Sequence, residues 1–177
     1  MNITVYCGAF SGNDPAFALA ARELGTWIGS QGHILIWGGG GTGLMGQVAT
    51  AALAAGGEAV GVIPDFLMEV ETPPAGFCNY QVTTTMPERR TRMIQLADAF
   101  VALPGGPGTL EEISEIMSLL KLGRLDKPLV LVNINGYFNS LTATYQIMVE
   151  QGFMSEALME RLMLADSVEQ AIAFLSA

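Results

Sequence analysis

Short apolar segments alternate with segments of helical periodicity along nearly the whole chain. Several apolar segments lack polar residues, which is typical of parallel strands covered on both faces. The pattern predicts strands at residues 3–7, 34–37, 59–63, 80–84, 100–103, 129–132 and 162–164. It predicts helices at residues 15–30, 43–55, 87–97, 109–122, 137–151 and 168–175. The first helix has a good N-cap in Asp14, followed by Pro15, and its apolar stripe consists of Phe17, Ala20, Ala21, Leu24 and Ile28.

Strands that alternate with helices predict an α/β fold. Because crossovers between parallel strands are right-handed, we expect a Rossmann-like, doubly wound, mostly parallel sheet of about seven strands with helices on both faces. The loosest segment, residues 69–79, is expected to be a loop, because neither part of the chain alone has enough strands for a sheet. Residues 1–177 are therefore predicted to form one domain. Ligands bind such sheets at the carboxyl ends of the strands.

A first glycine-rich loop, residues 38–46, follows the second predicted strand and opens a helix. Glycine lets backbone N–H groups approach a phosphate, and a helix N-terminus favours negative charge. The loop supplies Gly39, Gly40, Gly43 and Met45 as candidate binding residues, with a tight turn as the structural alternative. Its G-x-G-x-x-G match, with Asp65 after the next strand, is also compatible with a dinucleotide-dependent oxidoreductase. The position after the second strand and the lack of room for a substrate domain count against that function.

A second glycine-rich loop follows the strand at residues 100–103 and again opens a helix. Gly105, Gly106 and Gly108 free the backbone to bind an anion, and Thr109 can bond a phosphate or cap the helix. The spacing Thr109-x-x-Glu112 is also a capping box, which is a purely structural explanation.

The glutamates of the helix after this loop lie on different faces of the helix. At about 100° per residue, Glu112 falls in the apolar half of the helix, whereas Glu111 and Glu115 fall outside it. That apolar half consists of Leu110, Ile113, Ile116, Met117, Leu119 and Leu120. A carboxylate on the packed side, beside a phosphate-type loop, is placed for chemistry or for binding ribose hydroxyls.

Two arginines occupy positions where core residues are expected. Arg89 and Arg90 lie three and four residues after Met86, on the apolar stripe of the helix at 87–97, whereas Arg92 lies away from that stripe. Buried arginines need a partner, because an unpaired buried charge is costly. The two arginines could pair with internal acids or contribute to a subunit interface. The presence of two phosphate-type loops favours the alternative that they bind an anionic ligand.

Composition narrows the range of partners. The net charge is −9 with only eight lysines and arginines, which excludes a broad basic face, so we expect neither nucleic acid nor a membrane as a partner. A hydrophobic content of 50% excludes intrinsic disorder. Apolar runs are too short to cross a membrane, and the start of the chain is expected to be a strand rather than a leader, which favours a cytoplasmic location.

Cofactor chemistry finds little support in the sequence. Cys7, Cys78 and His33 are the only cysteines and histidine, and their spacing suggests neither a disulfide framework nor zinc. A Walker motif is absent, and neither Lys121 nor Lys127 is placed like a Schiff-base lysine. We therefore expect no metal and no cofactor.

Residues 104–112 read Pro-Gly-Gly-Pro-Gly-Thr-Leu-Glu-Glu, which resembles the P-G-G-x-G-T-x-x-E signature of the Lonely Guy family. Members of this family are cytokinin riboside 5′-monophosphate phosphoribohydrolases. Further matches lie at residues 38–40, 43–46, 62–64, 86–93, 126–128 and 136–141, so the resemblance covers nearly the whole chain.

The resemblance implies a homodimer that hydrolyses the N-glycosidic bond of nucleoside 5′-monophosphates, including AMP, to free base and ribose 5-phosphate without a metal. It implies that Arg89 and Glu112 are the catalytic pair. The nucleotide contacts that it implies are Arg90, Gly106, Gly108, Thr109 and Glu111, with Glu71 and Ser118 as weaker candidates. A non-catalytic nucleotide-binding or cofactor-carrier protein could use the same loops.

The chain departs from the family pattern at a few positions. Ala9 and Phe10 replace two serines in the loop after the first predicted strand. Pro87 stands where histidine is common, Arg90 where lysine is common, and Pro107 where an aromatic residue is common. None of these changes alters Arg89 or Glu112. We expect them to affect base preference and catalytic strength more than the type of reaction.

Overall fold

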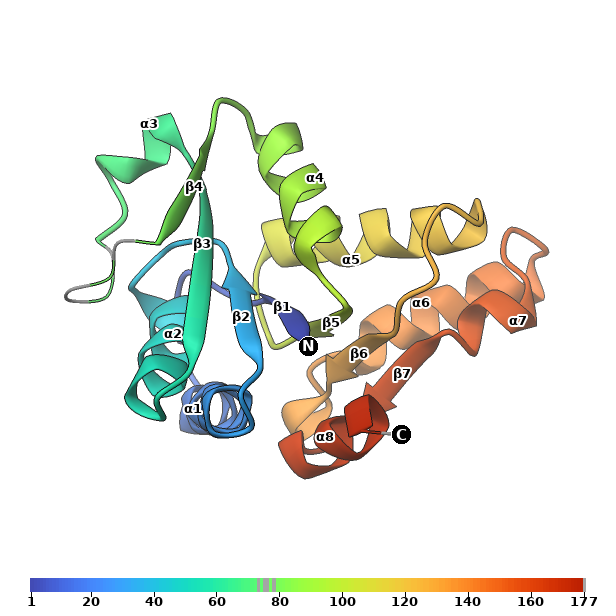
Figure 1. Ribbon diagram of the computed structural model, residues 1–177. Helices are drawn as coiled ribbons and strands as arrows, with labels where there is room; N and C mark the ends of the chain where they lie inside the picture. The colour runs from blue at the N-terminus through green and yellow to red at the C-terminus, as the bar shows by residue number, and fades with distance from the viewer. Residues whose placement is uncertain (73, 75–76, 78, 177) are drawn as a thin grey trace.

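The computed structural model describes residues 1–72, 74, 77 and 79–176. The strands formed by these residues make one parallel sheet in the order β4-β3-β2-β1-β5-β6-β7 (Figure 1). Their bounds are β1 (Asn2–Tyr6), β2 (Ile34–Trp37), β3 (Glu58–Pro64), β4 (Tyr80–Thr83), β5 (Ala99–Ala102), β6 (Leu129–Val132) and β7 (Leu162–Ala165). The expected α/β fold, with its parallel sheet, is confirmed.

Each of the predicted helices is present. Their bounds are α1 (Pro15–Ser30), α2 (Gly43–Ala54), α4 (Met86–Leu96), α5 (Pro107–Lys121), α6 (Asn139–Glu150) and α8 (Val168–Ser176). The sequence pattern missed two short helices, α3 (Asp65–Met68) and α7 (Glu156–Met159), and the 3-10 turn η1 (Ile134–Gly136). These elements are too short to show a helical period.

Helices cover both faces of the sheet, as expected. On one face α1, α2 and α8 pack on a core that includes Leu24, Val48 and Trp37. On the other face α4, α5 and α6 pack on a core around Phe100 and Ile113. The strands β5 and β6 are entirely buried between them, which explains why their sequences are continuously apolar.

The strand order reverses at β1, which lies between β2 and β5. The chain leaves β1 for α1 on one face and leaves β5 for α5 on the other face. Connections that leave two neighbouring strands in opposite directions open a crevice at the carboxyl ends of those strands. Both the first loop of the chain and the second glycine-rich loop begin at this point.

Helix α5 begins earlier than predicted. Gly106 is its N-cap and makes no side-chain capping bond, and Pro107 takes the first helical position, which it favours. Thr109 is therefore the third residue of the helix, so the capping-box explanation for Thr109 and Glu112 is wrong. Leu110 was expected in the packed half but is 40% exposed, because the surrounding first turn is open to solvent.

Candidate active site

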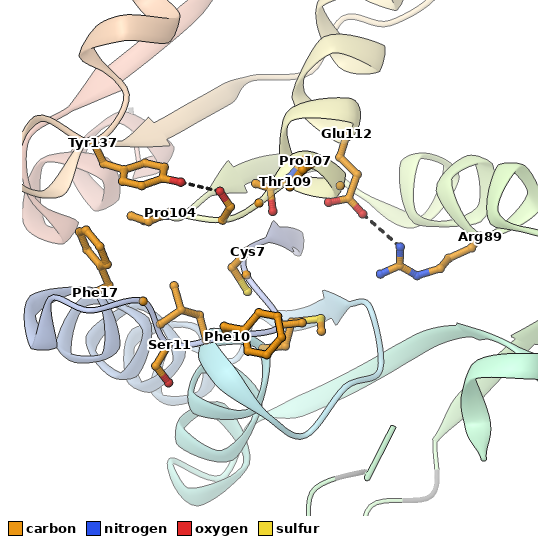
Figure 2. A pocket seen from close by; sticks show the side chains of 18 residues that line it. Cys7, Phe10, Ser11, Phe17, Arg89, Pro104, Pro107, Thr109, Glu112 and Tyr137 are labelled. Carbon is orange, nitrogen blue, oxygen red and sulfur yellow. Dashed lines mark hydrogen bonds and ion pairs between the residues drawn. The ribbon is translucent and has the colours of Figure 1, made fainter. Parts of the chain in front are cut away.

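A cleft of about 460 Å³ opens at the carboxyl ends of β1 and β5 (Figure 2). Its walls come from the loops after these strands, from the starts of α1, α2 and α5, and from single side chains of α4 and the turn after β6. The lining consists of Cys7, Gly8, Ala9, Phe10, Ser11, Gly12, Phe17, Leu44, Met45, Arg89, Pro104, Gly105, Gly106, Pro107, Gly108, Thr109, Glu112 and Tyr137. In Figure 2, Arg89 and Glu112 lie on one side of the cleft and Phe17 and Tyr137 on the other.

Backbone hydrogen bonds join the three loops that meet here. The Gly8 amide donates to the Pro104 carbonyl at 3.0 Å, and the Gly8 carbonyl accepts from the amides of Leu44 and Met45 at 3.1 and 3.3 Å. Gly43 has φ +56°, and a Cβ there would lie 2.2 Å from the Ala9 carbonyl oxygen, so only glycine fits. The glycine at 43 thus lets the first glycine-rich loop approach the loop after β1 closely.

The first glycine-rich loop is held from outside the cleft. Trp37 Nε1 donates to the Gly40 carbonyl at 3.0 Å, and the Tyr80 hydroxyl donates to the Gly39 carbonyl at 3.1 Å. Glu71 lies next to this loop, because a Cβ at Gly40 would be 2.6 Å from Glu71 Oε2. These contacts place Gly39, Gly40 and Glu71 beside the cleft but outside its lining.

Arg89 and Glu112 form a buried ion pair on the wall of the cleft. Arg89 Nη1 lies 3.2 Å from Glu112 Oε1, and both side chains are about nine-tenths buried. Arg89 Nε also donates to the Val62 carbonyl at 3.0 Å, which fixes the guanidinium at the end of β3. A Cβ at Gly38 would lie 2.0 Å from Arg89 Nη2, so the first glycine-rich loop also makes room for this side chain.

Burial raises the pKa of Glu112 from an ordinary 4.5 to about 7, although the positive charge of Arg89 opposes the shift. The carboxyl group therefore exchanges its proton near neutral pH, as an acid, a base or a charge stabiliser requires. Cys7 lies on the same cleft wall, and burial together with the charge of Glu112 raises its pKa far above the ordinary value. Its thiol stays protonated and is a poor nucleophile.

The second glycine-rich loop has the backbone features of an anion-binding loop. A Cβ at Gly105 would lie 2.1 Å from Thr109 Oγ1, whereas Cβ atoms at Gly106 and Gly108 would meet only open space. The amides of Gly108 and Thr109 belong to the first turn of α5, whose N–H groups have no acceptor within the helix. These amides and the helix dipole favour a bound phosphate or carboxylate.

Arg90 lies on a different side of α4 from Arg89 and does not line the cleft. Its guanidinium pairs with Glu115 at 2.7 Å and with Glu111 at 2.9 Å, so it joins α4 to α5. Ser118 is exposed on α5, also outside the lining. For Arg90, the structure therefore shows the pairing with internal acids that the sequence left as an alternative.

The predicted site residues divide into two groups. Those that line the cleft together are Met45, Arg89, Gly105, Gly106, Gly108, Thr109 and Glu112. Those outside the lining are Gly39, Gly40, Gly43, Glu71, Arg90, Glu111 and Ser118.

Sequence reasoning missed two aromatic residues of the cleft. Phe17 was assigned to the apolar stripe of the first helix, but it is half-buried and packs edge-to-face on Tyr137, with 5.5 Å between ring centroids. Tyr137 donates its hydroxyl proton to the Gly105 carbonyl at 2.5 Å. The match at residues 136–141 was the available signal for Tyr137, but it indicated no role.

Two further observations concern metals and membranes. Within residues 1–72, 74, 77 and 79–176, no three His, Cys, Asp or Glu side chains are grouped so that they could hold a metal ion. Across the same part of the chain, no helix is both long and apolar enough to cross a membrane.

Comparison with solved structures identifies proteins of the same fold. A molybdenum cofactor binding protein of Rippkaea orientalis has a TM-score of 0.75 at 20% identity, covering 99% of this chain and 94% of that one. A Moco carrier protein of Chlamydomonas reinhardtii has a TM-score of 0.74 at 26% identity, covering 99% and 94% of the two chains.

Comparison by sequence identifies nearer relatives. A family profile described as "Possible lysine decarboxylase" matches residues 45–175. A cytokinin riboside 5′-monophosphate phosphoribohydrolase of Mycobacterium tuberculosis is 41% identical over 96% of this chain and 90% of its own length. One of Arabidopsis thaliana is 39% identical over 96% of this chain and 80% of its own length. With this similarity over nearly all its length, the chain belongs to the Lonely Guy family, the family of these phosphoribohydrolases.

Proposed function

We propose that this protein hydrolyses the N-glycosidic bond of nucleoside 5′-monophosphates, with cytokinin nucleotides and AMP as candidate substrates. The products are the free base and ribose 5-phosphate. The observation that carries the proposal is the buried Arg89–Glu112 pair, at 3.2 Å, in the same cleft as the anion cradle at residues 105–109.

The charge that develops in this reaction explains why a shielded carboxylate is needed. When the C1′–N bond breaks, its electron pair leaves with the base and positive charge builds on the ribose, as in glycoside hydrolysis. Glu112 in its carboxylate form stabilises this cation, binds the sugar hydroxyls or activates the attacking water. Water supplies the hydroxyl group to C1′, and its proton balances the negative charge of the leaving base.

Arg89 supports the other side of the reaction. Its guanidinium is anchored by the Val62 carbonyl and by Glu112, so it keeps a fixed direction in the cleft. From there it stabilises the leaving base or orients the substrate. The amides at residues 105–109 hold the 5′-phosphate, and this remote binding energy positions the reacting bond. Glu111, Glu71 and Ser118 remain predictions from the family resemblance, because they lie outside the lining of the cleft. For Arg90 we expect the pairing with Glu111 and Glu115 in place of a nucleotide contact.

A base-release assay tests this function. The protein is incubated with AMP, with cytokinin riboside monophosphates and with the corresponding nucleosides, and free base and ribose 5-phosphate are separated by chromatography. We expect release from the monophosphates in equal amounts of base and ribose 5-phosphate. Tight nucleotide binding without released base would contradict hydrolysis and support the carrier alternative, which shares the fold of the molybdenum cofactor proteins. Saturable NAD binding would instead favour an oxidoreductase.

The proposal includes a homodimer in the cytoplasm with no nucleic-acid partner, as the family resemblance and the net charge of −9 suggest. Sedimentation velocity at micromolar concentration tests the assembly. A monomer that retains full base release would contradict the dimer and leave the reaction unaffected.

A further inference from the structure

Tyr137 reaches the anion cradle from an element that the proposed reaction does not otherwise use. Its ring lies at the mouth of the cleft, where it packs on Phe17 and on Phe138 with centroid distances of 5.5 and 5.1 Å. Its hydroxyl donates to the Gly105 carbonyl at 2.5 Å (Figure 2). This is a short hydrogen bond between a side chain and the backbone of the anion-binding loop.

The turn that carries Tyr137 is held in an unusual backbone conformation. Asn135 has φ 52° and is followed by Gly136 with φ 74°, so two consecutive residues are left-handed. Asn135 Nδ2 donates to Asp14 Oδ2 at 2.8 Å, which ties the turn to the start of α1. The buried Asn133 accepts the Phe138 amide at 2.7 Å from inside the turn. Strain at a non-glycine residue persists only where surrounding contacts impose it, and such positions gather at functional sites.

The effect of the Tyr137 hydrogen bond follows from its acceptor, the carbonyl of Gly105. This position needs glycine, because a Cβ would lie 2.1 Å from Thr109 Oγ1. Glycine also gives the peptide between residues 105 and 106 the greatest freedom to rotate. In a trans peptide the carbonyl and the following amide point in opposite directions, and the described residues contain no cis peptide. Holding the Gly105 carbonyl toward Tyr137 therefore turns the Gly106 amide away from Tyr137.

We propose that Tyr137 is a positioning residue: its hydroxyl fixes the Gly105–Gly106 peptide so that the Gly106 amide is kept ready for the substrate's 5′-phosphate. This inference rests on the proposed function, because it takes the anion to be the phosphate of a nucleotide. In this role Tyr137 favours binding of the phosphorylated substrate and takes no part in bond cleavage.

Tyr137→Phe tests the inference, because it keeps the ring and removes only the hydroxyl. Dissociation constants of AMP and adenosine are measured by calorimetry in a Glu112→Gln background, which prevents turnover during the titration. We expect AMP to bind roughly 3- to 10-fold more weakly after Tyr137→Phe, as for the loss of one hydrogen bond. Adenosine affinity and the thermal midpoint are expected to stay unchanged. Tyr145→Phe, which removes a buried hydroxyl on α6 outside the cleft, is the matched control and should leave AMP affinity unchanged.

The outcomes separate this inference from the proposed function. Weaker AMP binding with unchanged adenosine binding supports the role of Tyr137, even if the wild-type protein releases no base. Equal weakening for AMP and adenosine, an unchanged AMP affinity, or no AMP binding in the Glu112→Gln background would overturn it. In the catalytically intact protein, Tyr137→Phe should raise KM for AMP by the same factor and leave kcat unchanged, and a fall in kcat alone would also contradict it.

Discussion

At the scale of single residues, the distinctive feature of Glu112 is the burial of its carboxyl group. It is buried beside one guanidinium, and burial raises its pKa to about 7. If the carboxylate is the form that stabilises the ribosyl cation, kcat/KM for AMP should be low at pH 5.5, reach half its maximum near pH 7 and level off above about pH 8. Base release measured from pH 5 to 9 checks this. A rate that falls as pH rises through 7 would show instead that protonated Glu112 is the active form.

The same pKa makes a prediction about stability. The folded-state pKa of Glu112 lies above its ordinary 4.5, so its contribution to stability is fully present below about pH 4.5 and is lost as pH rises through 7. The loss is roughly 3 kcal/mol, because one pKa unit corresponds to about 1.4 kcal/mol. Urea unfolding at pH 4.5, 6 and 8.5 should show the wild type losing stability relative to Glu112→Gln. A difference between the two proteins that does not change with pH would contradict the raised pKa.

Gly38 is expected to affect activity indirectly, because a side chain at this position would displace Arg89. In Gly38→Ala the new Cβ would lie 2.0 Å from Arg89 Nη2, so the guanidinium must leave the position from which it pairs with Glu112. We expect kcat/KM for AMP to fall roughly 100-fold, as for a catalytic group displaced by about 1 Å. Circular dichroism should show a folded protein. Full activity in this variant would mean that the position of Arg89 does not matter.

The sequence predicted which helix face each of these residues lies on, but not which residue each one contacts. Helical periodicity placed Arg89 and Glu112 on packed faces, and both are buried. It placed Arg90 on the same stripe, yet Arg90 pairs with Glu111 and Glu115. Which acid an arginine meets depends on how α4 packs against α5, and no local pattern encodes that packing.

At the scale of elements, α4 and α5 act as a pair. Arg90 of α4 bridges two acids of α5, of which Glu111 is half-exposed and Glu115 one-third exposed. Partly exposed ion pairs contribute little, so Arg90→Met should lower the free energy of unfolding by at most ~1 kcal/mol. AMP affinity should change less than about twofold, because Arg90 does not line the cleft. Thermal unfolding and calorimetry measure both effects. A large loss of AMP affinity with unchanged stability would show that Arg90 contacts the nucleotide.

Element positions were largely predictable because each core element is long and strongly patterned. The helix Pro15–Ser30 and the strands Ile34–Trp37 and Leu129–Val132 have the predicted bounds. The sequence pattern predicts the start of α5 two residues too late, because Thr109 is a favourable N-cap residue, whereas the helix begins at Pro107. The left-handed turn before α6 was not predicted, because its conformation depends on contacts with Asp14 and Asn133.

At the scale of the whole molecule, the site exists because β1 lies between β2 and β5. Alternating strands and helices predicted a doubly wound sheet, but the order of the strands was not predictable, because parallel pairing joins segments far apart in sequence. The order brings the loop after β1 beside the loop after β5, and Leu44 and Met45 of the first glycine-rich loop line the same cleft as the second glycine-rich loop. The glycine clusters can be recognised in the sequence, whereas their proximity in space depends on the order of the strands.

The most direct test of the account compares the wild type with Glu112→Gln on the same substrate. Base release from AMP is measured at pH 7.5 together with the AMP dissociation constant and the thermal midpoint. We expect stoichiometric adenine and ribose 5-phosphate from the wild type, a rate roughly 10²- to 10⁴-fold lower in Glu112→Gln, and AMP affinity that is retained. Equal rates of adenine release from the two proteins would contradict this expectation.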